Sequence, residues 1–286
     1  MCKRQCDYLL RASNALSARR VPHVGFHAGQ RRGAGFPTWR SNFLKAPDVH
    51  DLVHDAVAKT EADKTLITRG DFQVRLADNE GQRSKSNMLV NAMYSWRGYK
   101  AQFEPPRLDQ MTLQACRGDC TFGTMTIGFD SPAGLAADTL YKTVVDEYRS
   151  RNRCVCELTR LAIDGELRSK DVLGALFHLA YIFGALMRGV TDVFIEVNPR
   201  HVVFYKRMLN FRQIGPTKLC PRVNAPAVLL HLEAAYVADQ IERYGGHRGD
   251  GQRSLYPYFF SKKEQDGLAR RLSGLAAPPG AVAEPA

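Results

Sequence analysis

Three polar residues, Arg168, Ser169 and Lys170, stand directly before an apolar segment with helical periodicity. A helix that begins there points unpaired backbone N–H groups at these side chains, and its dipole adds partial positive charge. Backbone amides and cationic side chains at a helix N-terminus bind phosphate groups. These residues could therefore suit a phosphate group, although Ser169 also suits the ordinary role of helix N-cap.

Two other residues carry groups that could move protons. Glu157 is a carboxylate in a predicted strand, and Tyr205 is a phenol in a predicted short helix. Each has a purely structural alternative, because Glu157 could pair with a cation elsewhere and Tyr205 could be a core aromatic. Arg160 could either hold the fold or face a substrate. Glu157 and Arg160 occupy opposite faces of a regular strand, so they should not pair directly unless a bulge intervenes.

These residues fall on neighbouring elements of one predicted unit. Residues 155–163 alternate as a strand, residues 170–188 predict an apolar helix that ends at Gly189, and residues 193–197 predict a buried strand. Such a unit makes a right-handed parallel crossover. The other expected elements are strands at 72–76, 111–116, 121–129, 211–214 and 227–232 and helices at 79–97, 138–149, 201–209, 236–243 and 261–272. The mixture predicts an α+β fold.

The charge is concentrated at one end of the chain. The net charge of +11 over 286 residues resembles that of nucleic-acid-binding proteins. Residues 1–45, however, hold nine Lys or Arg and a single acid, Asp7, so most of the excess lies there. This distribution argues against a nucleic-acid-binding core. We expect a disordered basic leader at 1–45, one domain at 46–272 with its core at 70–245, and a disordered tail at 273–286.

The seven cysteines are scattered along the chain. Their spacings match no zinc motif, so we expect no metal site. Reduced thiols are typical of a cytoplasmic protein. No run of 18 apolar residues predicts a transmembrane segment.

Residues 198–211, NPRHVVFYKRMLNF, resemble the signature that follows the fifth strand of GNAT acyltransferases: an Asn, a helix with a Tyr, then Gly-Phe. Asn210 replaces the glycine, and Asn tolerates the positive φ that ends such a helix. Residues 156–163, CELTRLAI, look like the fourth strand of acyl-homoserine-lactone synthases and of long-chain N-acyl amino acid synthases. The apolar helix after it and the later strand PAVLLHL are closer to the second family. The resemblance covers roughly residues 70–245.

The resemblance implies a GNAT-like, mostly antiparallel sheet, flanked by helices, with a splayed parallel strand pair at its centre. Pantetheine would lie in the gap between those strands. Glu157 is then the base that takes a proton from the amine, directly or through water, and Tyr205 protonates the departing thiolate. A backbone amide near Leu161 to Ile163 would stabilise the oxyanion. The substrate-binding candidates are Arg160, Leu161, Ile163, Asn198 and, as a holder of the amine, Asp109.

One segment departs from the pattern of acetyl-CoA-dependent GNAT enzymes. Residues 164–171, DGELRSKD, lack the glycine pair whose amides hold the pyrophosphate of coenzyme A. A carrier-protein phosphopantetheine has only one phosphate, which suits Arg168, Ser169 and Lys170. The departure favours acyl carrier protein over acyl-CoA as the donor. No tightly bound cofactor is expected, because the acyl-phosphopantetheine is a co-substrate.

The expected activity is therefore transfer of a long-chain acyl group from acyl carrier protein to the α-amine of an amino acid in the cytoplasm. No nucleic-acid partner is expected, although the acylated product could associate with membranes. Three alternatives stay open. An acyl-homoserine-lactone synthase needs an N-terminal lid with Arg and Trp that is not evident here. An acetyl-CoA-dependent N-acetyltransferase lacks its loop, and a non-catalytic GNAT-like module would form no product.

Overall fold

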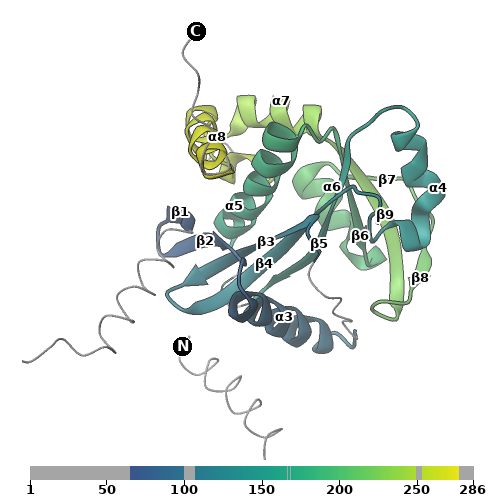
Figure 1. Ribbon diagram of the computed structural model, residues 1–286. Helices are drawn as coiled ribbons and strands as arrows, with labels where there is room; N and C mark the ends of the chain where they lie inside the picture. Colours follow the sequence, from purple (N-terminus) through teal and green to yellow (C-terminus); the bar gives the residue numbers. More distant parts are fainter. Residues whose placement is uncertain (1–64, 100–106, 166, 168, 249–252, 277–286) are drawn as a thin grey trace, which may run out of the picture. The chain divides into compact units, whose positions relative to one another are not determined.

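A nine-stranded sheet forms the centre of the fold in the computed structural model (Figure 1). The residues that the structure describes are 65–99, 107–165, 167, 169–248 and 253–276. The expected leader at 1–45, the whole of Arg168 and the end of the expected tail lie outside these residues.

The strand order is β1-β2-β3-β4-β5-β6-β9-β7, with β8 paired to β9. Among the described strands every pairing is antiparallel except that of β5 with β6, which is parallel. The strands are β1 (Thr65–Arg69), β2 (Phe72–Leu76), β3 (Gln110–Arg117), β4 (Cys120–Phe129), β5 (Val155–Ile163), β6 (Asp192–Val197), β7 (Arg212–Gln213), β8 (Lys218–Cys220) and β9 (Ala225–Glu233). This arrangement confirms the predicted GNAT-like α+β fold class.

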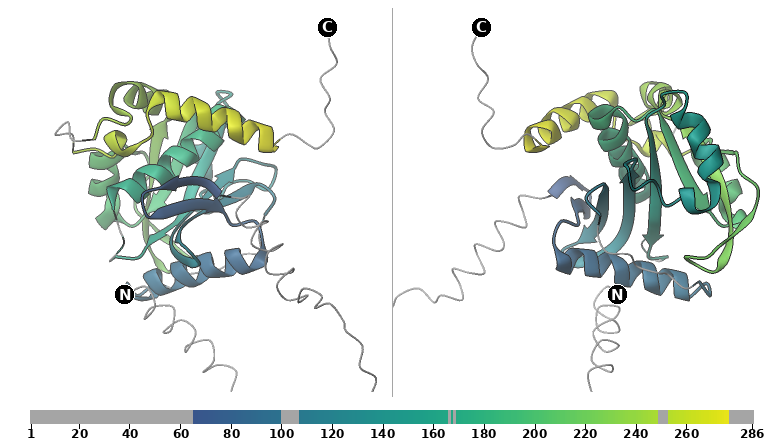
Figure 2. Two further views of the ribbon diagram at one scale, coloured as in Figure 1. Left: turned by 90° about the vertical axis from the view of Figure 1, so that its left-hand side faces the viewer. Right: turned by 45° about the vertical axis from the view of Figure 1, so that its right-hand side comes forward.

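Helices cover both faces of the sheet (Figure 2). The α-helices are α3 (Glu80–Ser95), α4 (Asp138–Arg149), α5 (Lys170–Tyr181), α6 (Val202–Leu209), α7 (Ala234–Tyr244) and α8 (Lys262–Ala276). Helix α5 packs against β3 and β4 on one face, while α3 packs against β4 and β5 on the other. Helix α4 closes a smaller core in which Tyr141 and Val145 contact Phe194 and Leu229. Within the described residues, no helix is both long enough and apolar enough to span a membrane.

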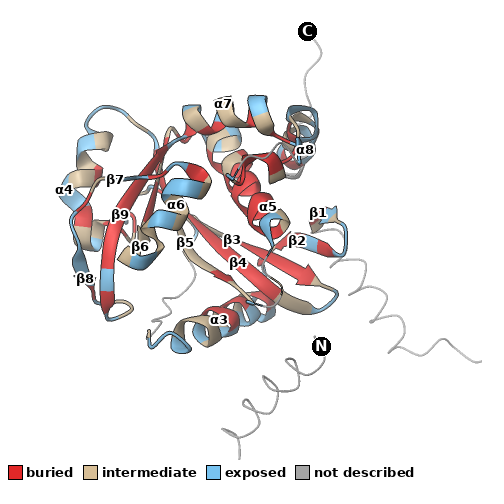
Figure 3. Cartoon of the chain, turned by 180° about the vertical axis from the view of Figure 1, so that it is seen from behind, coloured by how far each residue is buried: buried red, intermediate tan, exposed pale blue. Residues whose placement is uncertain are grey.

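Helix α5 is buried over most of its length because its residues are apolar on all sides (Figure 3). The Ser169 hydroxyl accepts a hydrogen bond from the Val172 N–H at 3.2 Å and caps the helix, as predicted. After Tyr181 the helix widens into a π-helical turn, Ile182–Leu186. It ends before Gly189, whose φ of +67° is the left-handed conformation that glycine adopts freely. The expected helix at 170–188 is therefore confirmed.

Strand β5 contains a bulge at the position where the site forms. Thr126 of β4 pairs with Thr159 and Thr124 pairs with Ala162, so β5 has one residue more than β4 in this interval. The extra residue of the bulge is accommodated at Arg160, whose φ is +53°. A non-glycine residue in this region is strained, which is common where a strand turns a side chain towards a functional site.

The structure also contains elements that the sequence patterns did not predict, namely β1 and β8. The strand expected at 211–214 is reduced to β7, Arg212–Gln213. Helix α8 runs to Ala276, past the residue 272 boundary expected for the domain. Asn210 adopts a φ of +66° at the end of α6, as its place in the GNAT signature requires.

Candidate active site

Strands β5 and β6 separate part-way along their length. They pair at Val155 with Asp192, Cys156 with Val193 and Glu157 with Phe194, and no further. Beyond this point β5 stays bonded to β4 and β6 stays bonded to β9. The two parallel strands therefore diverge as a wedge whose walls are each supported from the outside. The expected splayed pair is confirmed.

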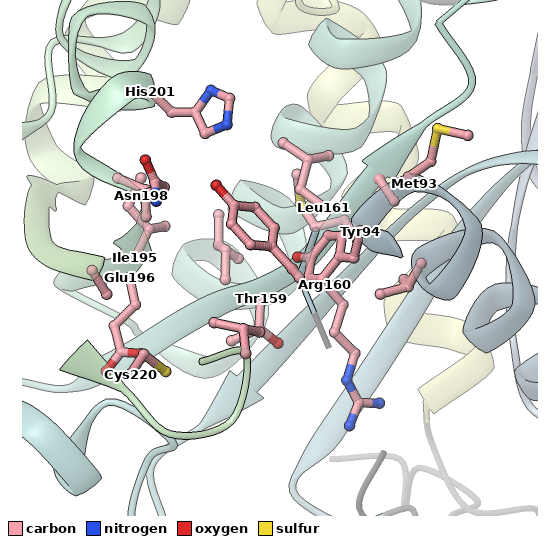
Figure 4. Close-up of a pocket in the computed structure, with 18 of the residues that line it drawn as sticks. Met93, Tyr94, Thr159, Arg160, Leu161, Ile195, Glu196, Asn198, His201 and Cys220 are labelled. Carbon is pink, nitrogen blue, oxygen red and sulfur yellow. The ribbon is translucent and has the colours of Figure 1, made fainter. Parts of the chain in front are cut away.

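A cavity of about 460 Å³ fills the wedge (Figure 4). Its walls are the diverging segments of β5 and β6, together with side chains from α3, α5, α6 and the segment that leads into β9. Apolar groups include Leu158, Leu173, Phe177 and Ile195, and polar groups include Tyr94, Arg160, Glu196, Asn198, His201, Tyr205 and Arg222. A mostly apolar cleft with a few convergent polar groups is the usual form of a ligand site.

Five of the residues selected from the sequence line this cavity: Arg160, Leu161, Ile163, Asn198 and Tyr205. The Asn198 side chain also has structural contacts, because it accepts a hydrogen bond from the Arg200 N–H and donates one to the Pro226 carbonyl at 3.1 Å. The first bond caps the turn that follows β6, and the second fixes the end of β6 to the start of β9. The backbone near Leu161, expected to offer an oxyanion donor, lies at the bulge on the cavity wall.

Tyr205 is held by neighbouring aromatic rings. Its ring makes edge contacts with Phe177, Phe204 and Phe211, at centroid distances of 6.5, 5.2 and 5.8 Å. Burial raises the pKa of the Tyr205 phenol, and the nearby Tyr94 acts in the same direction. The phenol therefore remains protonated at neutral pH and is available as a proton donor on the cavity wall.

Glu157, selected as the base, is buried at the closed end of the wedge and is not among the cavity-lining residues. Its two carboxylate oxygens accept hydrogen bonds from the backbone N–H groups of Ala136 and Ala137, at 2.8 and 2.9 Å. A Cβ atom at Gly128 on β4 would lie 3.0 Å from the carboxylate, so glycine there leaves it room. Burial raises the pKa of Glu157, and the two amides oppose that shift.

Asp109 is likewise not among the cavity-lining residues. Its carboxylate accepts hydrogen bonds from Arg107 and from the Ser131 hydroxyl, and it thereby ties the start of β3 to the segment after β4. The Arg107 guanidinium and the Ser131 hydroxyl lower the pKa of Asp109 to about 2. In this arrangement the side chain fastens a loop outside the cavity lining.

A family model described as N-acyl amino acid synthase FeeM matches residues 85–233, which is more than half of the chain. The chain belongs to the N-acyl amino acid synthase FeeM family. The structure of FeeM, an N-acyl amino acid synthase from uncultured soil microbes, is 26% identical, with a TM-score of 0.52, and the match covers 57% of this chain and 90% of that one.

Two more distant structures share less of the geometry. A putative N-acetyltransferase from Lactobacillus plantarum is 17% identical, with a TM-score of 0.42 and coverage of 58% of this chain and 99% of that one. The AHL synthase LasI is 14% identical, with a TM-score of 0.38 and coverage of 57% and 89%. No curated protein matches the chain. The membership in the FeeM family makes this protein an N-acyltransferase.

The candidate site extends to the first turn of α5, where Leu173 lines the cavity. Lys170 lies there with its ammonium 5.1 Å from the centre of the Tyr258 ring. Asp171 in the same turn forms ion pairs with Arg248 at 2.7 Å and with Arg69 at 3.9 Å. Two arginines distant in sequence thus add to the cationic end of α5, and neither could be selected from local sequence. Within the described residues, no cluster of His, Cys, Asp or Glu side chains could hold a metal ion.

One corner of the cavity was missed by the sequence reasoning. Glu196 on β6 accepts a hydrogen bond from the Arg222 guanidinium and lies 3.9 Å from the Cys220 sulfur. Figure 4 shows Glu196 and Cys220 together on one side of the cavity, across from Tyr94 and Arg160. The sequence did carry a signal for Glu196, because it is a charged residue within the otherwise apolar second half of β6. Arg222 lies in a turn that carries no such signal.

Proposed function

We propose that this enzyme transfers a long-chain acyl group from the phosphopantetheine thioester of acyl carrier protein to the α-amine of an amino acid. The observation that carries the proposal is the cavity between β5 and β6, which begins where their pairing stops at Glu157 and Phe194. A pantetheine arm has amide groups that can bond to the edge of a splayed strand. The proposal places the reaction in the cytoplasm, together with its carrier protein.

The cationic end of α5 supports a donor with one phosphate. Ser169, Lys170, Arg69 and Arg248 surround the first turn of this helix, and the cavity reaches Leu173 in the same turn. Helix dipole, backbone amides and cations together suit a phosphate group. With no glycine pair before the helix, coenzyme A would lack its usual pyrophosphate cradle. In this proposal Arg168, Ser169 and Lys170 bind the phosphate of phosphopantetheine.

In this proposal the acyl chain extends from the cavity towards the apolar core. A second, small cavity of about 30 Å³ shares Leu158 and Phe177 with the first, and its other lining residues, mostly apolar, come from α5 and its π-helical end, β5, β6, β9, α6, α7 and the segments between elements. It is too small for a long chain as it stands, so the chain would enter by displacing the Phe177 ring. Burial of methylene groups there would favour longer acyl chains by about 0.8 kcal/mol for each CH₂.

The reaction forms the amide C–N bond and breaks the thioester C–S bond. Tyr205 lies on the wall where the thiolate would leave, and its protonated phenol would supply the proton that the sulfur needs. A backbone amide near Leu161 would stabilise the oxyanion, while Arg160 and Asn198 would border the substrates. The resemblance to GNAT enzymes assigns the base to Glu157. Its bonds to Ala136 and Ala137 support a second role for it, as the holder of the segment that precedes α4.

The direct test uses the full chain with acyl carrier proteins charged with acyl groups of several lengths, and with pooled amino acids. Mass spectrometry of the lipid extract should show N-acyl amino acids, with yields that rise with chain length. Acyl-homoserine lactones would instead identify a lactone synthase. An acetylated amine formed only from acetyl-CoA would contradict both the donor and the chain length.

A charge-reversed variant tests the donor separately. Lys170→Glu combined with Arg248→Glu should raise the KM for acyl carrier protein at least tenfold, because the anionic phosphate and carrier lose their cations. The KM for an acyl thioester of N-acetylcysteamine, which carries no phosphate, should stay within twofold. Arg243→Glu, on the exposed end of α7, is the matched charge control. Equal effects on both donors would contradict the assignment of this helix end.

A further inference from the structure

Two oppositely charged groups at one corner of the cavity each have a buried atom without a partner. Glu196 uses its Oε2 atom for Arg222, but its Oε1 atom is buried and accepts no hydrogen bond. Arg222 donates through one terminal nitrogen, but its Nε atom is buried and donates to nothing. Both residues line the cavity. An unpaired buried polar atom is costly, so the corner is incomplete until a ligand supplies an acceptor and a donor.

The chemistry of the missing ligand follows from these two atoms. The Glu196 oxygen requires a hydrogen-bond donor and favours a cation, whereas the Arg222 nitrogen requires an acceptor and favours an anion. An α-amino acid carries an ammonium and a carboxylate on the same carbon, so one molecule can complete both groups. A simple amine would complete only Glu196. The corner thus matches a zwitterionic acceptor.

The surroundings of Glu196 also suit proton transfer. Burial raises the pKa of Glu196 to about 7, with Arg222 opposing the shift and the Glu157 carboxylate adding to it. The other titratable groups near it are Cys220, from the end of β8, and the Tyr141 phenol of α4. A base with a pKa close to the working pH combines a large unprotonated fraction with a strong affinity for the proton.

We propose that Glu196 is the catalytic base that takes the proton from the acceptor's α-ammonium and that Arg222 binds the acceptor's α-carboxylate. This inference rests on the proposed acyl transfer. The freed nitrogen lone pair forms a bond to the thioester carbonyl carbon, and the C–S bond breaks with its electron pair on sulfur. The nitrogen loses its second proton as the amide forms, and the thiolate gains one. The net reaction releases one proton, which Glu196 passes to water.

Glu157 is the competing assignment for the base. Its two oxygens are already bound to the Ala136 and Ala137 amides, whereas Glu196 has an oxygen to spare at the cavity wall. If Glu196 is the base, Glu157→Gln should keep the rising limb of the pH profile, with its midpoint moved to lower pH because the Glu157 carboxylate no longer raises the pKa of Glu196. If Glu157 is the base, the same variant should abolish this limb. A comparison of Glu157→Gln with Glu196→Gln therefore shows which of the two carboxylates is the base.

The experiment measures kcat/KM for the amino acid acceptor between pH 5 and 9, with acyl carrier protein as the donor. Wild type should show a rising limb with a midpoint near pH 7. Glu196→Gln should lose about 100-fold at pH 7 and should also lose this limb. Glu242→Gln, an exposed change on α7, should keep both the rate and the limb. Activity of Glu196→Gln within twofold of wild type, or an unchanged limb in that variant, would overturn the assignment.

A second nucleophile distinguishes the loss of a base in Glu196→Gln from a folding defect in that variant. Hydroxylamine is largely unprotonated at neutral pH and needs little help from a base. With hydroxylamine, Glu196→Gln should approach the wild-type rate, which a misfolded protein could not do. A deficit of the same size with both nucleophiles would contradict a role in proton removal. Absence of any acyl transfer by wild type would instead refute the proposed function itself.

The carboxylate contact has its own measurement. Wild type should prefer a free amino acid over the corresponding amino acid amide, because only the acid offers an anion to Arg222. Arg222→Gln should raise the KM for the free acid at least tenfold and bring the two acceptors within threefold of each other. A variant that keeps the wild-type preference would show that the carboxylate binds elsewhere.

Discussion

Glu157 of β5 and Phe194 of β6 form the last pair at which the two parallel strands meet. On the outer sides, β4 follows β5 to Ile163 and β9 follows β6 to Val197. The wedge is therefore not a frayed sheet end, because each diverging strand keeps its other neighbour. The bulge around Arg160 lies three residues beyond Glu157 and increases the bend of β5 away from β6.

A bulky side chain in the wedge should block catalysis without unfolding the protein. Leu161 lines the cavity and is only partly buried, so Leu161→Trp should place its indole ring where pantetheine must lie. We expect kcat/KM to fall at least tenfold while the melting temperature changes by less than about 3 °C. Val203→Trp on the exposed side of α6 is the control. Full activity of Leu161→Trp would show that the substrates do not enter this gap.

Tyr205→Phe should distinguish the role of the hydroxyl group as a proton donor from the role of the ring in packing. Phenylalanine keeps the contacts with Phe177, Phe204 and Phe211 and removes only the hydroxyl. If the phenol protonates the leaving thiolate, kcat should fall by about 100-fold with little change in KM. The deficit should shrink with donors whose thiol is more acidic, since those leave without a proton. A deficit independent of the thiol would indicate a different role for the phenol.

The elements around the wedge could be predicted because their patterns are local. Nine alternating residues define β5, and an apolar stretch between Ser169 and Gly189 defines the helix that begins as α5, although not the π-helical turn near its end. Strands β1 and β8 could not be predicted, because they are short and depend on pairing with other strands of the sheet. The bulge at Arg160 is likewise set by the register against β4 and leaves no local pattern.

The site could be predicted only in part, for a related reason. Alternation places Glu157 and Arg160 on opposite faces of β5, but both faces of this strand are covered, so the pattern cannot say which face meets the substrate. Tyr205 and Asn198 were found through the GNAT signature. Arg222 joins Glu196 from a turn beyond β8, and that encounter exists only after β8 and β6 have both paired with β9.

Two buried groups should give stability opposite dependences on pH. Burial lowers the pKa of His178 from 6.5 to about 4, so protonation favours the unfolded chain and stability is lost as pH falls from about 6.5 to 4. Burial raises the pKa of Glu196 from 4.5 to about 7, so stability is lost as pH rises from about 4.5 to 7. Each contribution is about 3 kcal/mol, and over most of this window they should largely cancel.

Single variants should expose each contribution to the free energy of unfolding. Glu196→Gln should remove the loss at higher pH, so its stability should rise with pH between 4.5 and 6.5. His178→Gln should remove the loss at lower pH, so its stability should fall over the same range. Chemical denaturation at half-unit pH steps measures both slopes. Slopes of the same sign in the two variants would contradict these assignments.

Two glycine substitutions in helices should have opposite effects on stability. At Gly174 of α5 a Cβ atom would lie 2.7 Å from the Tyr258 carbonyl oxygen, so Gly174→Ala must push the backbone of the segment before α8 away. We expect Gly174→Ala to lower the free energy of unfolding by about 1–3 kcal/mol.

At Gly267 of α8 nothing lies within 4 Å of the new atom, so Gly267→Ala should raise the free energy of unfolding by about 0.5–1 kcal/mol through helix propensity. Denaturant titration of both variants measures the difference. Stabilisation by Gly174→Ala would mean that α5 and the segment at Tyr258 are not packed as closely as this contact requires, and the position of Lys170 beside the Tyr258 ring would then also be in question.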